Sequence, residues 1–316
     1  MQEKVMRRAK MLRAIREYFH QDAVLEVDTP IMSQFGNSDP ALLNFMSTFN
    51  GPGKLYRHTT YLITSPEYHM KRLLAHQSGS IYYLGKVFRD GELSPRHTPE
   101  FTMLEWYRVN YDLFELTQEV IHLIRMLAKQ HIEVVEYSYL TLFMEKLALN
   151  PFMATEAELD AVLKMQGVSL AFTPQTKDEY LDLIMSHLIE PTFDSDVITV
   201  LHSYPASQAS LAKITQDCAG NAIGKRFEVY WRGLELANGY EELTDPIEQR
   251  TRFEAENKVR TQYGLAPVAI DELFLQEMAS MPALVSGVAM GIDRLLMAAT
   301  NAHNINDVIL FSFEES

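Results

Sequence analysis

The chain has 316 residues, 47% of them hydrophobic, and its 42 acidic and 28 basic residues give a formal net charge of −14. Its length and apolar fraction allow one large or two modest globular domains with a packed core. The acidic balance disfavours broad nonspecific binding to nucleic-acid phosphates and leaves room only for a local basic face.

The single cysteine, Cys218, excludes an internal disulfide and a cysteine-cluster metal site, which agrees with a reducing compartment. Its plainest interpretation is a small apolar side chain or an idle thiol. No run of about 18 apolar residues occurs, and residues 1–16 mix charged with apolar side chains, unlike a signal peptide. We therefore expect a cytoplasmic protein that does not enter a membrane.

The first predicted elements are a helix and a short strand. Apolar residues recur every three or four positions from Glu3 to Phe19, with arginines between them, which predicts an amphipathic helix. A short strand at residues 25–29 is then ended, or placed at an edge, by Pro30. Glycines and prolines scattered over residues 36–60 predict an irregular segment.

A strand at residues 61–64 leads directly into a helix. Ser65 suits the N-cap and Pro66 the first helical position, and the helix is expected to end near His76. Two further strands, at residues 81–89 and 100–108, flank a polar loop and predict a long hairpin. A helix starts at Asp112, and weaker helical patterns continue to about residue 190.

Strands return after Pro191, at residues 197–201, 226–236 and 284–290, with a charged helix at 247–263. A helix at 291–299 and a terminal strand at 308–313 complete the chain. Hairpin-linked strands with helices in separate blocks predict an α+β fold around an antiparallel sheet. We interpret residues 1–316 as one domain with a mainly helical insertion at about 112–195.

The predicted hairpin carries the first candidate site. An arginine at a strand end, Arg89, can hold a phosphate with its planar guanidinium, and an aromatic ring on the return strand, Phe101, can stack on a base. Strand alternation places Phe101, Met103, Glu105 and Tyr107 on one face. Taken alone, Arg89 is more often an ordinary surface residue.

The second candidate is the segment from Glu235 to Leu243. Asn238-Gly239 favours a turn or bulge, so the carboxylates on either side of it can converge on a divalent cation bound to a polyphosphate. Carboxylates at this separation are also common by chance.

The third candidate is Ser286 to Arg294, in which a strand of small residues leads to a helix with arginine in its first turn. Glycines let a ligand approach the backbone, and a helix start favours anions. The alternative is tight packing of strand against helix, with Asp293 and Arg294 solvated.

In chain order these segments resemble the signature motifs of class II aminoacyl-tRNA synthetases, in particular the lysyl branch. The resemblance covers nearly the whole chain. The matching stretches are Thr64 to Tyr68, Phe88-Arg89, His97 to Glu105, Glu235 to Leu243 and Gly291 to Arg294. Ser203 to Ala212 and Glu105 to Arg108 are also similar to the ligases that attach β-lysine to elongation factor P.

The resemblance implies an α+β class II catalytic domain that binds ATP. Arg89 would grip the α-phosphate, while Arg294 would grip the γ-phosphate and, with Phe101, sandwich adenine. Glu235 and Glu242 would hold Mg²⁺, and these two glutamates and two arginines would form the catalytic set. Further ATP contacts would come from Asp90, Gly91, Glu92, His97, Thr98, Leu236 and Gly291.

The resemblance also implies a pocket for a lysine-like substrate. Glu67, Glu105 and Tyr107 would recognise its two amino groups, since buried cations need paired carboxylates. Ser65, Asn238 and Glu242 would complete the pocket. Ala289 stands where lysyl-tRNA synthetases carry glycine, and one methyl in a tight pocket shifts selectivity by roughly 1–3 kcal/mol.

The implied reaction needs no protein nucleophile, because the substrate carboxylate attacks the α-phosphate and the acyl-adenylate is captured by a lysine ε-amine. Catalysis would be positioning and charge neutralisation. The acceptor would be elongation factor P and the substrate lysine or (R)-β-lysine. The core begins near Met1, so we expect no anticodon-binding OB-fold and little activity on tRNA. The family also implies a homodimer built on the first helix and the Pro30 strand.

Two positions depart from the lysyl pattern. The family's loop usually reads Arg-x-Glu, whereas Gly91 stands at the glutamate position and Glu92 follows, so either Glu92 or a backbone carbonyl takes over the adenine contact. Thr98 replaces a frequent asparagine. Two other functions are left open: a free-standing lysyl-tRNA synthetase core, and an inactive synthetase homologue used as a binding or regulatory module.

Two further sequence features give only weak evidence for a functional site. Gly51 to Lys54 lacks the spacing and the trailing hydroxyl of a Walker phosphate loop, and a surface turn is the simpler interpretation. His69, His76 and His97 do not have the spacing of metal ligands, although His97 lies near the ATP loop and either contacts phosphate or is structural.

Overall fold

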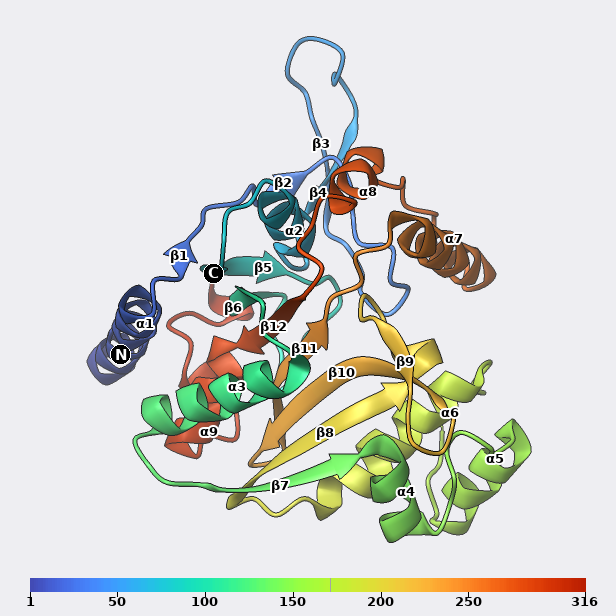
Figure 1. Ribbon diagram of the computed structural model, residues 1–316. Helices are drawn as coiled ribbons and strands as arrows, with labels where there is room; N and C mark the ends of the chain where they lie inside the picture. The colour runs from blue at the N-terminus through green and yellow to red at the C-terminus, as the bar shows by residue number, and fades with distance from the viewer. Residues whose placement is uncertain (171) are drawn as a thin grey trace. The chain divides into compact units, whose positions relative to one another are not determined.

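The computed structural model describes residues 1–170 and 172–316, which form two compact units. Unit 1 comprises Met1–Leu116 and Leu243–Ser316, and unit 2 comprises Thr117–Glu242. In Figure 1 unit 1 is coloured blue to cyan and orange to red, and unit 2 green to orange. The boundary between the units falls inside helix α3 (Leu113–Ala128). This helix is the one predicted to start at Asp112, and the structure confirms it.

Unit 1 begins with helix α1 (Gln2–Gln21), which buries Met11, Ile15 and Phe19 at four-residue spacing, as the periodicity predicts. The Phe19 ring stacks on Tyr82, with centroids 4.5 Å apart, and meets the edge of Trp106 at 5.6 Å. Strand β1 (Leu25–Glu26) follows. These contacts anchor the amphipathic helix on the sheet of unit 1.

The sheet of unit 1 has the order β1-β5-β6-β12. Strand β1 pairs in parallel with β5 (Ile81–Phe88). The predicted hairpin is confirmed, because β5 pairs antiparallel with β6 (Glu100–Val109) from Ile81 opposite Tyr107 to Phe88 opposite Glu100. Strand β12 (Val285–Gly291) then pairs antiparallel with β6.

A small second sheet of unit 1 has the order β2-β4-β3. Its strands are β2 (Met32–Ser33), β3 (Met46–Thr48) and β4 (Thr59–Leu62). The expectation of an irregular segment at 36–60 is therefore wrong in part, because β3 and the start of β4 lie within it. Figure 1 shows the β3–β4 loop projecting away from α2 (Glu67–Ala75) and α8 (Glu272–Met278).

The start of α2 lies one residue later than predicted. Pro66 is the N-cap and Glu67 the first helical residue, while the Ser65 hydroxyl accepts the Glu67 N–H at 3.0 Å. The Ser65 side chain reaches the N–H only two residues on, which is a local serine turn and not a helix cap.

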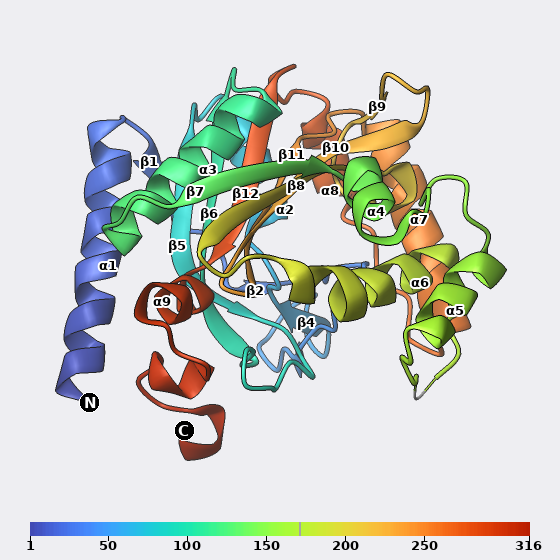
Figure 2. The ribbon, with the colours of Figure 1, turned by 90° about the horizontal axis from the view of Figure 1, so that it is seen from below.

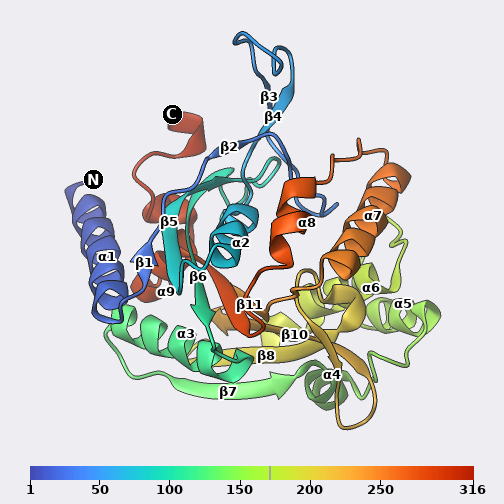
Figure 3. The ribbon, with the colours of Figure 1, turned by 45° about the horizontal axis from the view of Figure 1, so that its top comes forward.

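Three helices of unit 1 lie side by side in Figure 3: α2, α8 and α7 (Pro246–Gln262). Between them, the Tyr68 ring stacks on Phe274 at 4.9 Å and lies 5.7 Å from Phe253. The charged helix at 247–263 was predicted, and α8 was not. Helix α9 (Ile292–Thr300) also matches its prediction and precedes the C-terminal turns (Figure 2).

The predicted terminal strand at 308–313 is wrong. The C-terminus forms two 3₁₀ turns, Ile305–Asp307 and Phe313–Glu315. The Val308 and Ile309 N–H groups both bond to the Ile305 carbonyl, at 3.0 and 3.1 Å, so turn bonds take the backbone groups that a strand would present to a neighbour.

Unit 2 contains strands in the order β7-β8-β10-β11, with a short β9 also paired to β10. Their bounds are β7 (Glu133–Ser138), β8 (Val197–Pro205), β9 (Ile214–Gln216), β10 (Ala222–Trp231) and β11 (Leu234–Glu241). Strand β7 is parallel to β8, and the other pairs are antiparallel.

The single strand predicted at 226–236 is wrong, because β10 and β11 are two strands of a hairpin. The turn between them is Arg232-Gly233, with φ of 54° and 68°. A two-residue hairpin turn with both φ values positive usually carries Asn-Gly or Asp-Gly. Arginine in the first turn position hid this hairpin from sequence analysis.

The rest of unit 2 is largely helical, with α4 (Tyr139–Leu147), α5 (Glu156–Met165), α6 (Lys177–Ile184), a π-helical turn (Met185–Ile189) and two 3₁₀ turns (Glu190–Thr192, Ala206–Gln208). Ser138, Thr155 and Thr176 cap the three α-helices with their hydroxyls. The predicted helical stretch therefore exists, although it also holds β7. The single-domain organisation stays a prediction. Across the described residues, every helix is too short or too polar to cross a membrane.

Candidate active site

A buried carboxylate forms the centre of the predicted amine pocket in unit 1. Glu105, on β6, has only 2% of its surface exposed. Its Oε2 accepts the Ser65 hydroxyl at 2.7 Å, and its Oε1 accepts the Tyr107 hydroxyl at 2.8 Å. The structure thus brings together three of the residues predicted to bind substrate.

Burial raises the pKa of the Glu105 carboxyl to about 7, and the nearby Glu67 carboxylate raises this pKa further. The two hydroxyl hydrogen bonds and the Lys71 ammonium oppose the rise. A carboxylate that is costly to ionise in the empty protein is stabilised when a cation arrives. The geometry therefore suits recognition of an ammonium group.

Sequence analysis missed Lys71. Its side chain is fully buried, and its Nζ lies 2.6 Å from Glu67 Oε1, one helical turn earlier on α2. The one available signal was the Glu–Lys spacing of four residues on a helix that also buries Met70 and Leu74. Such pairs are usually on solvated helix faces, so the pattern alone did not single out this one.

Ala289 lies beside this pocket. It is the cross-strand partner of Glu105 in the β6–β12 ladder, while Gly287 pairs with Tyr107 and Gly291 with Met103. Directly paired residues in an antiparallel ladder have Cβ atoms about 4.5–5.5 Å apart on the same face. The Ala289 methyl is therefore next to the Glu105 side chain, where sequence analysis placed a selectivity-determining group.

The predicted nucleotide residues of unit 1 form a second group at the open end of the β5–β6 hairpin. The Arg89 guanidinium lies 5.1 Å from the centre of the Phe101 ring, and Arg89 Nη1 is 3.7 Å from Glu92 Oε1. Gly91 has φ of +78°, a conformation that glycine adopts without strain, which explains glycine at this position of the loop. The Asp90 N–H bonds to the Leu43 carbonyl at 3.0 Å and fixes the loop's start.

His97 joins this group through Arg294, since its Nε2 contacts Arg294 Nη2 and its Nδ1 lies 2.8 Å from the Ser94 hydroxyl. Burial, aided by the charges of Arg294, Arg89 and Arg96, lowers the pKa of His97 to about 4. The imidazole is therefore neutral at neutral pH and accepts from Arg294. Thr98 is buried next to it in the chain. The neutral ring orients the guanidinium predicted to meet the γ-phosphate.

Asp293 is an anchor, and the alternative that it is solvated is wrong. Its carboxylate is buried and accepts the Thr102 N–H at 2.7 Å and the Arg8 guanidinium at 2.5 Å. Gly291 is the N-cap of α9, which places Arg294 in the first helical turn as predicted. Asp293 thereby ties the start of α9 to β6 and α1.

In unit 2, the turn predicted at Asn238-Gly239 is wrong, and a bulge lies two residues earlier in the strand. Asn238-Gly239 lies inside β11, paired with Glu228 and Phe227, and forms no turn. The ladder instead shifts register between Val229, opposite Ala237, and Tyr230, opposite Glu235, so Leu236 is an extra residue. The two glutamates are seven positions apart in the chain, and this odd spacing would put them on opposite faces of a regular strand. The extra residue places Glu235 on the face of Asn238, and continued alternation adds Glu242.

Arg226 holds Asn238 on that face and was also missed. Its Nε donates to Asn238 Oδ1 at 3.3 Å, and its other nitrogens reach the Gln208 carbonyl, at 2.7 Å, and the Glu228 carboxylate. The Asn238 amide donates onward to the Tyr240 hydroxyl at 2.9 Å. The Arg226 guanidinium also lies 4.4 Å from the Tyr204 ring centre. Asn238 is thus oriented from both sides.

Across the described residues, no three His, Cys, Asp or Glu side chains form a metal-binding group. Two carboxylates on one face are nonetheless a sufficient protein contribution for Mg²⁺, which usually takes its other ligands from phosphates and water. The roles of Glu235 and Glu242 in metal binding, of Leu236 in ATP binding and of Asn238 in substrate binding stay predictions.

Comparison with known families shows to which family the chain belongs. The family of class II tRNA synthetases (D, K and N) matches residues 1–315. The chain belongs to this family. The α+β fold expected of a class II synthetase domain is thereby confirmed, and the sheets and flanking helices of the two units agree with it.

The chain is also similar to curated proteins named elongation factor P–(R)-β-lysine ligase. It is 40% identical over 313 residues to the protein from Hamiltonella defensa, covering 99% of this chain and 95% of the relative. It is 42% identical to that of Mannheimia succiniciproducens, covering 96% and 93%, and 42% identical to that of Edwardsiella ictaluri, covering 99% and 95%.

Proposed function

We propose that the protein is an ATP-dependent ligase that activates (R)-β-lysine as an acyl-adenylate and transfers it to a lysine of elongation factor P. One observation carries the proposal: near-full-length identity of 40–42% to ligases with this name. The buried Glu105 carboxylate, paired with Ala289 across the ladder, adds a pocket suited to a substrate amine.

Two bond exchanges make up the reaction. A carboxylate oxygen of the amino acid attacks the α-phosphorus, and the bond to the leaving pyrophosphate breaks. The ε-amine of the acceptor then attacks the acyl carbon, loses a proton and expels AMP. Neither step needs a covalent bond to the enzyme, so the protein's contribution is orientation and charge neutralisation.

We propose that Arg89 and Arg294 neutralise the phosphates, with Phe101 as the surface on which adenine stacks. Guanidinium groups suit phosphate because their N–H groups form a planar fork. The neutral His97 ring supports the proposed role of Arg294, because it accepts a hydrogen bond without adding positive charge. Mg²⁺ held by Glu235 and Glu242 would supply further neutralisation of the phosphates.

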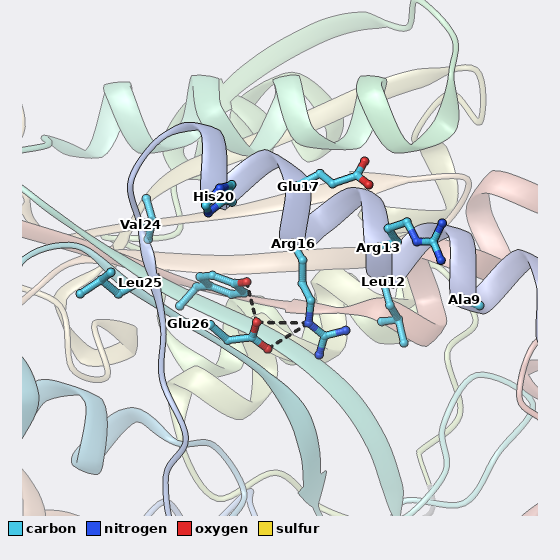
Figure 4. Close-up of a pocket in the computed structure, with 10 residues that line it drawn as sticks. Ala9, Leu12, Arg13, Arg16, Glu17, His20, Val24, Leu25 and Glu26 are labelled. Atoms are coloured by element: carbon cyan, nitrogen blue, oxygen red, sulfur yellow. Dashed lines mark hydrogen bonds and ion pairs between the residues drawn. The ribbon is translucent and has the colours of Figure 1, made fainter.

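We further propose that the protein forms a homodimer through α1 and β1. A groove of about 790 Å³ is lined there by α1, β1 and Tyr82, and Leu25 at its edge is 59% exposed. Figure 4 shows Arg16 directed at Glu26. The Arg16 Nε donates to the Glu26 carboxylate at 3.1 Å, and the Tyr82 hydroxyl donates to it at 2.9 Å. Light scattering should give a dimer mass for the wild type and a monomer mass for Leu25→Asp. Phe114→Asp, at an equally exposed apolar site (64%), is the control.

The decisive experiment is the intact mass of purified elongation factor P after incubation with the protein, ATP, Mg²⁺ and (R)-β-lysine. We expect one added lysyl residue, and no addition without ATP or with an Arg294→Ala enzyme. Transfer to tRNA in place of elongation factor P would identify a lysyl-tRNA synthetase core. ATP–pyrophosphate exchange that does not respond to any lysine isomer would identify an inactive homologue.

A further inference from the structure

The amine pocket of unit 1 contains a cation of its own. The ammonium of Lys71 is fully buried and lies 2.6 Å from Glu67, while Glu67 acts electrostatically on the buried Glu105. Lysine is among the residues least often fully buried, because removing its charge from water is costly without a close counter-charge. Glu67 supplies that counter-charge, so the carboxylate that raises the pKa of Glu105 is itself paired with a buried ammonium.

The polar and charged groups around Glu105 come from α2, β5, β6 and the loop before α2. Helix α2 contributes Glu67 and Lys71, and β6 contributes the Tyr107 hydroxyl. Strand β5 contributes Tyr83, whose pKa is raised by burial and, in smaller part, by Asp28 and Glu105. Ser65 donates from the preceding loop, and the facing residue of β12 is the uncharged Ala289. Lys71 is the one cation that acts on Glu105 among these groups.

The sum of these charges has a consequence for the substrate. With Glu67, Glu105 and Lys71 all ionised, these three groups carry one net negative charge, which one of the substrate's two ammonium groups neutralises. Without Lys71, the Glu67 carboxylate would still raise the pKa of Glu105 and no cation among these groups would oppose the rise, so Glu105 would keep its proton to a higher pH. A protonated carboxyl is a weaker partner for an ammonium group.

We propose that Lys71 is a positioning residue that holds Glu67 in place and sets the charge of the amine pocket, so that the pocket accepts one substrate ammonium at neutral pH. The inference deepens the proposed function and rests on it. Lys71 itself does not contact the reacting atoms. It acts through the two carboxylates, one by direct ion pairing and the other through the field.

The test compares Lys71→Met with wild type in lysine-dependent ATP–pyrophosphate exchange, measured from pH 5.5 to 9. We expect the KM for (R)-β-lysine to rise at least tenfold, with kcat and the KM for ATP changed less than about threefold. We also expect the rising limb of kcat/KM against pH to move to higher pH. Lys86→Met removes the exposed Lys86–Glu100 pair (3.1 Å) on β5 and is the matched control.

If Lys71 merely stabilises α2, Lys71→Met should lower the unfolding temperature and leave unchanged both the KM for (R)-β-lysine and the rising limb of the pH profile. That result overturns the inference. Should Lys71→Met fail to fold, Glu67→Gln is compared with Glu67→Gln/Lys71→Met, since both remove the Glu67 carboxylate that Lys71→Met alone would leave without its ion-pair partner. The rising limb of kcat/KM against pH should then lie at higher pH in the double variant than in Glu67→Gln. The same pH profile in both variants would contradict the inference. Absence of exchange in wild type and in Lys86→Met would instead contradict the proposed function.

Discussion

Glu105 and Ala289 face each other across the β6–β12 ladder, so the one methyl group that distinguishes this segment from the lysyl pattern lies beside the buried carboxylate of the amine pocket. Selectivity between lysine isomers depends on where the carbon chain and amines sit relative to that carboxylate. We therefore expect the Ala289 methyl to limit how closely the substrate approaches β12.

Ala289→Gly should therefore shift the preference toward α-lysine. Removing one methyl from a tight pocket changes relative kcat/KM by roughly 10–200-fold. The measurement is ATP–pyrophosphate exchange with (R)-β-lysine and α-lysine as competing substrates. Ala222→Gly, the same change at an exposed position of β10, should leave the ratio unchanged. An unchanged ratio in Ala289→Gly would remove Ala289 from the specificity determinants.

The raised pKa of Glu105, about 7, predicts a specific pH dependence of stability without substrate. A carboxyl whose folded pKa lies above its unfolded value binds its proton more tightly in the folded protein, so its contribution is present at low pH and is lost as pH rises toward 7. Glu105→Gln should lack this loss, and the variant should gain stability relative to wild type between pH 4.5 and 7, on the order of 3 kcal/mol. Urea unfolding at several pH values checks the sign, and a constant difference would show that Glu105 has an ordinary pKa.

The Asp293 anchor predicts a stability effect without a change of chemistry at the arginines. Asp293→Asn removes the negative charge that Arg8 meets, and breaking a buried ion pair from one side costs about 3 kcal/mol. The midpoint of urea unfolding should fall accordingly. Glu3→Gln, which breaks the exposed Arg7–Glu3 pair on the same helix, should have little effect. Equal effects of the two variants would exclude an anchoring role.

Arg226 should control the orientation of Asn238. Replacing it with methionine leaves Glu228 without its cation and Asn238 without its donor, so we expect a loss of about 3–5 kcal/mol of stability and a higher KM for the amino acid. Arg226→Met/Glu228→Gln should recover stability and keep the raised KM, because the Asn238 contact is still missing. Recovery of both properties in the double variant would show that Arg226 acts only through Glu228.

Much of the site could be predicted because its signals are local in sequence. The start of α9 after Gly291, with Arg294 in its first turn, and the β5–β6 hairpin that carries Arg89 and Phe101 follow from short-range periodicity and from residues that begin or end elements. The Arg232-Gly233 turn was not predicted because arginine, its first residue, has no preference for such turns. The terminal strand was wrongly predicted because the apolar residues at the C-terminus lie in and around 3₁₀ turns.

The sequence by itself determined the family and the order of most main elements, and it named the residues that we propose meet phosphate, metal and amine, because those depend on motifs and on local backbone preference. Only the tertiary structure decided that Leu236 shifts the register and turns Glu235 toward the face of Asn238, that Asp293 is an anchor, and that the Lys71 ammonium is buried against the Glu67 carboxylate. Strand pairing and burial bring together groups that are distant in the chain, and the net charge of a pocket depends on which of these groups lie in it.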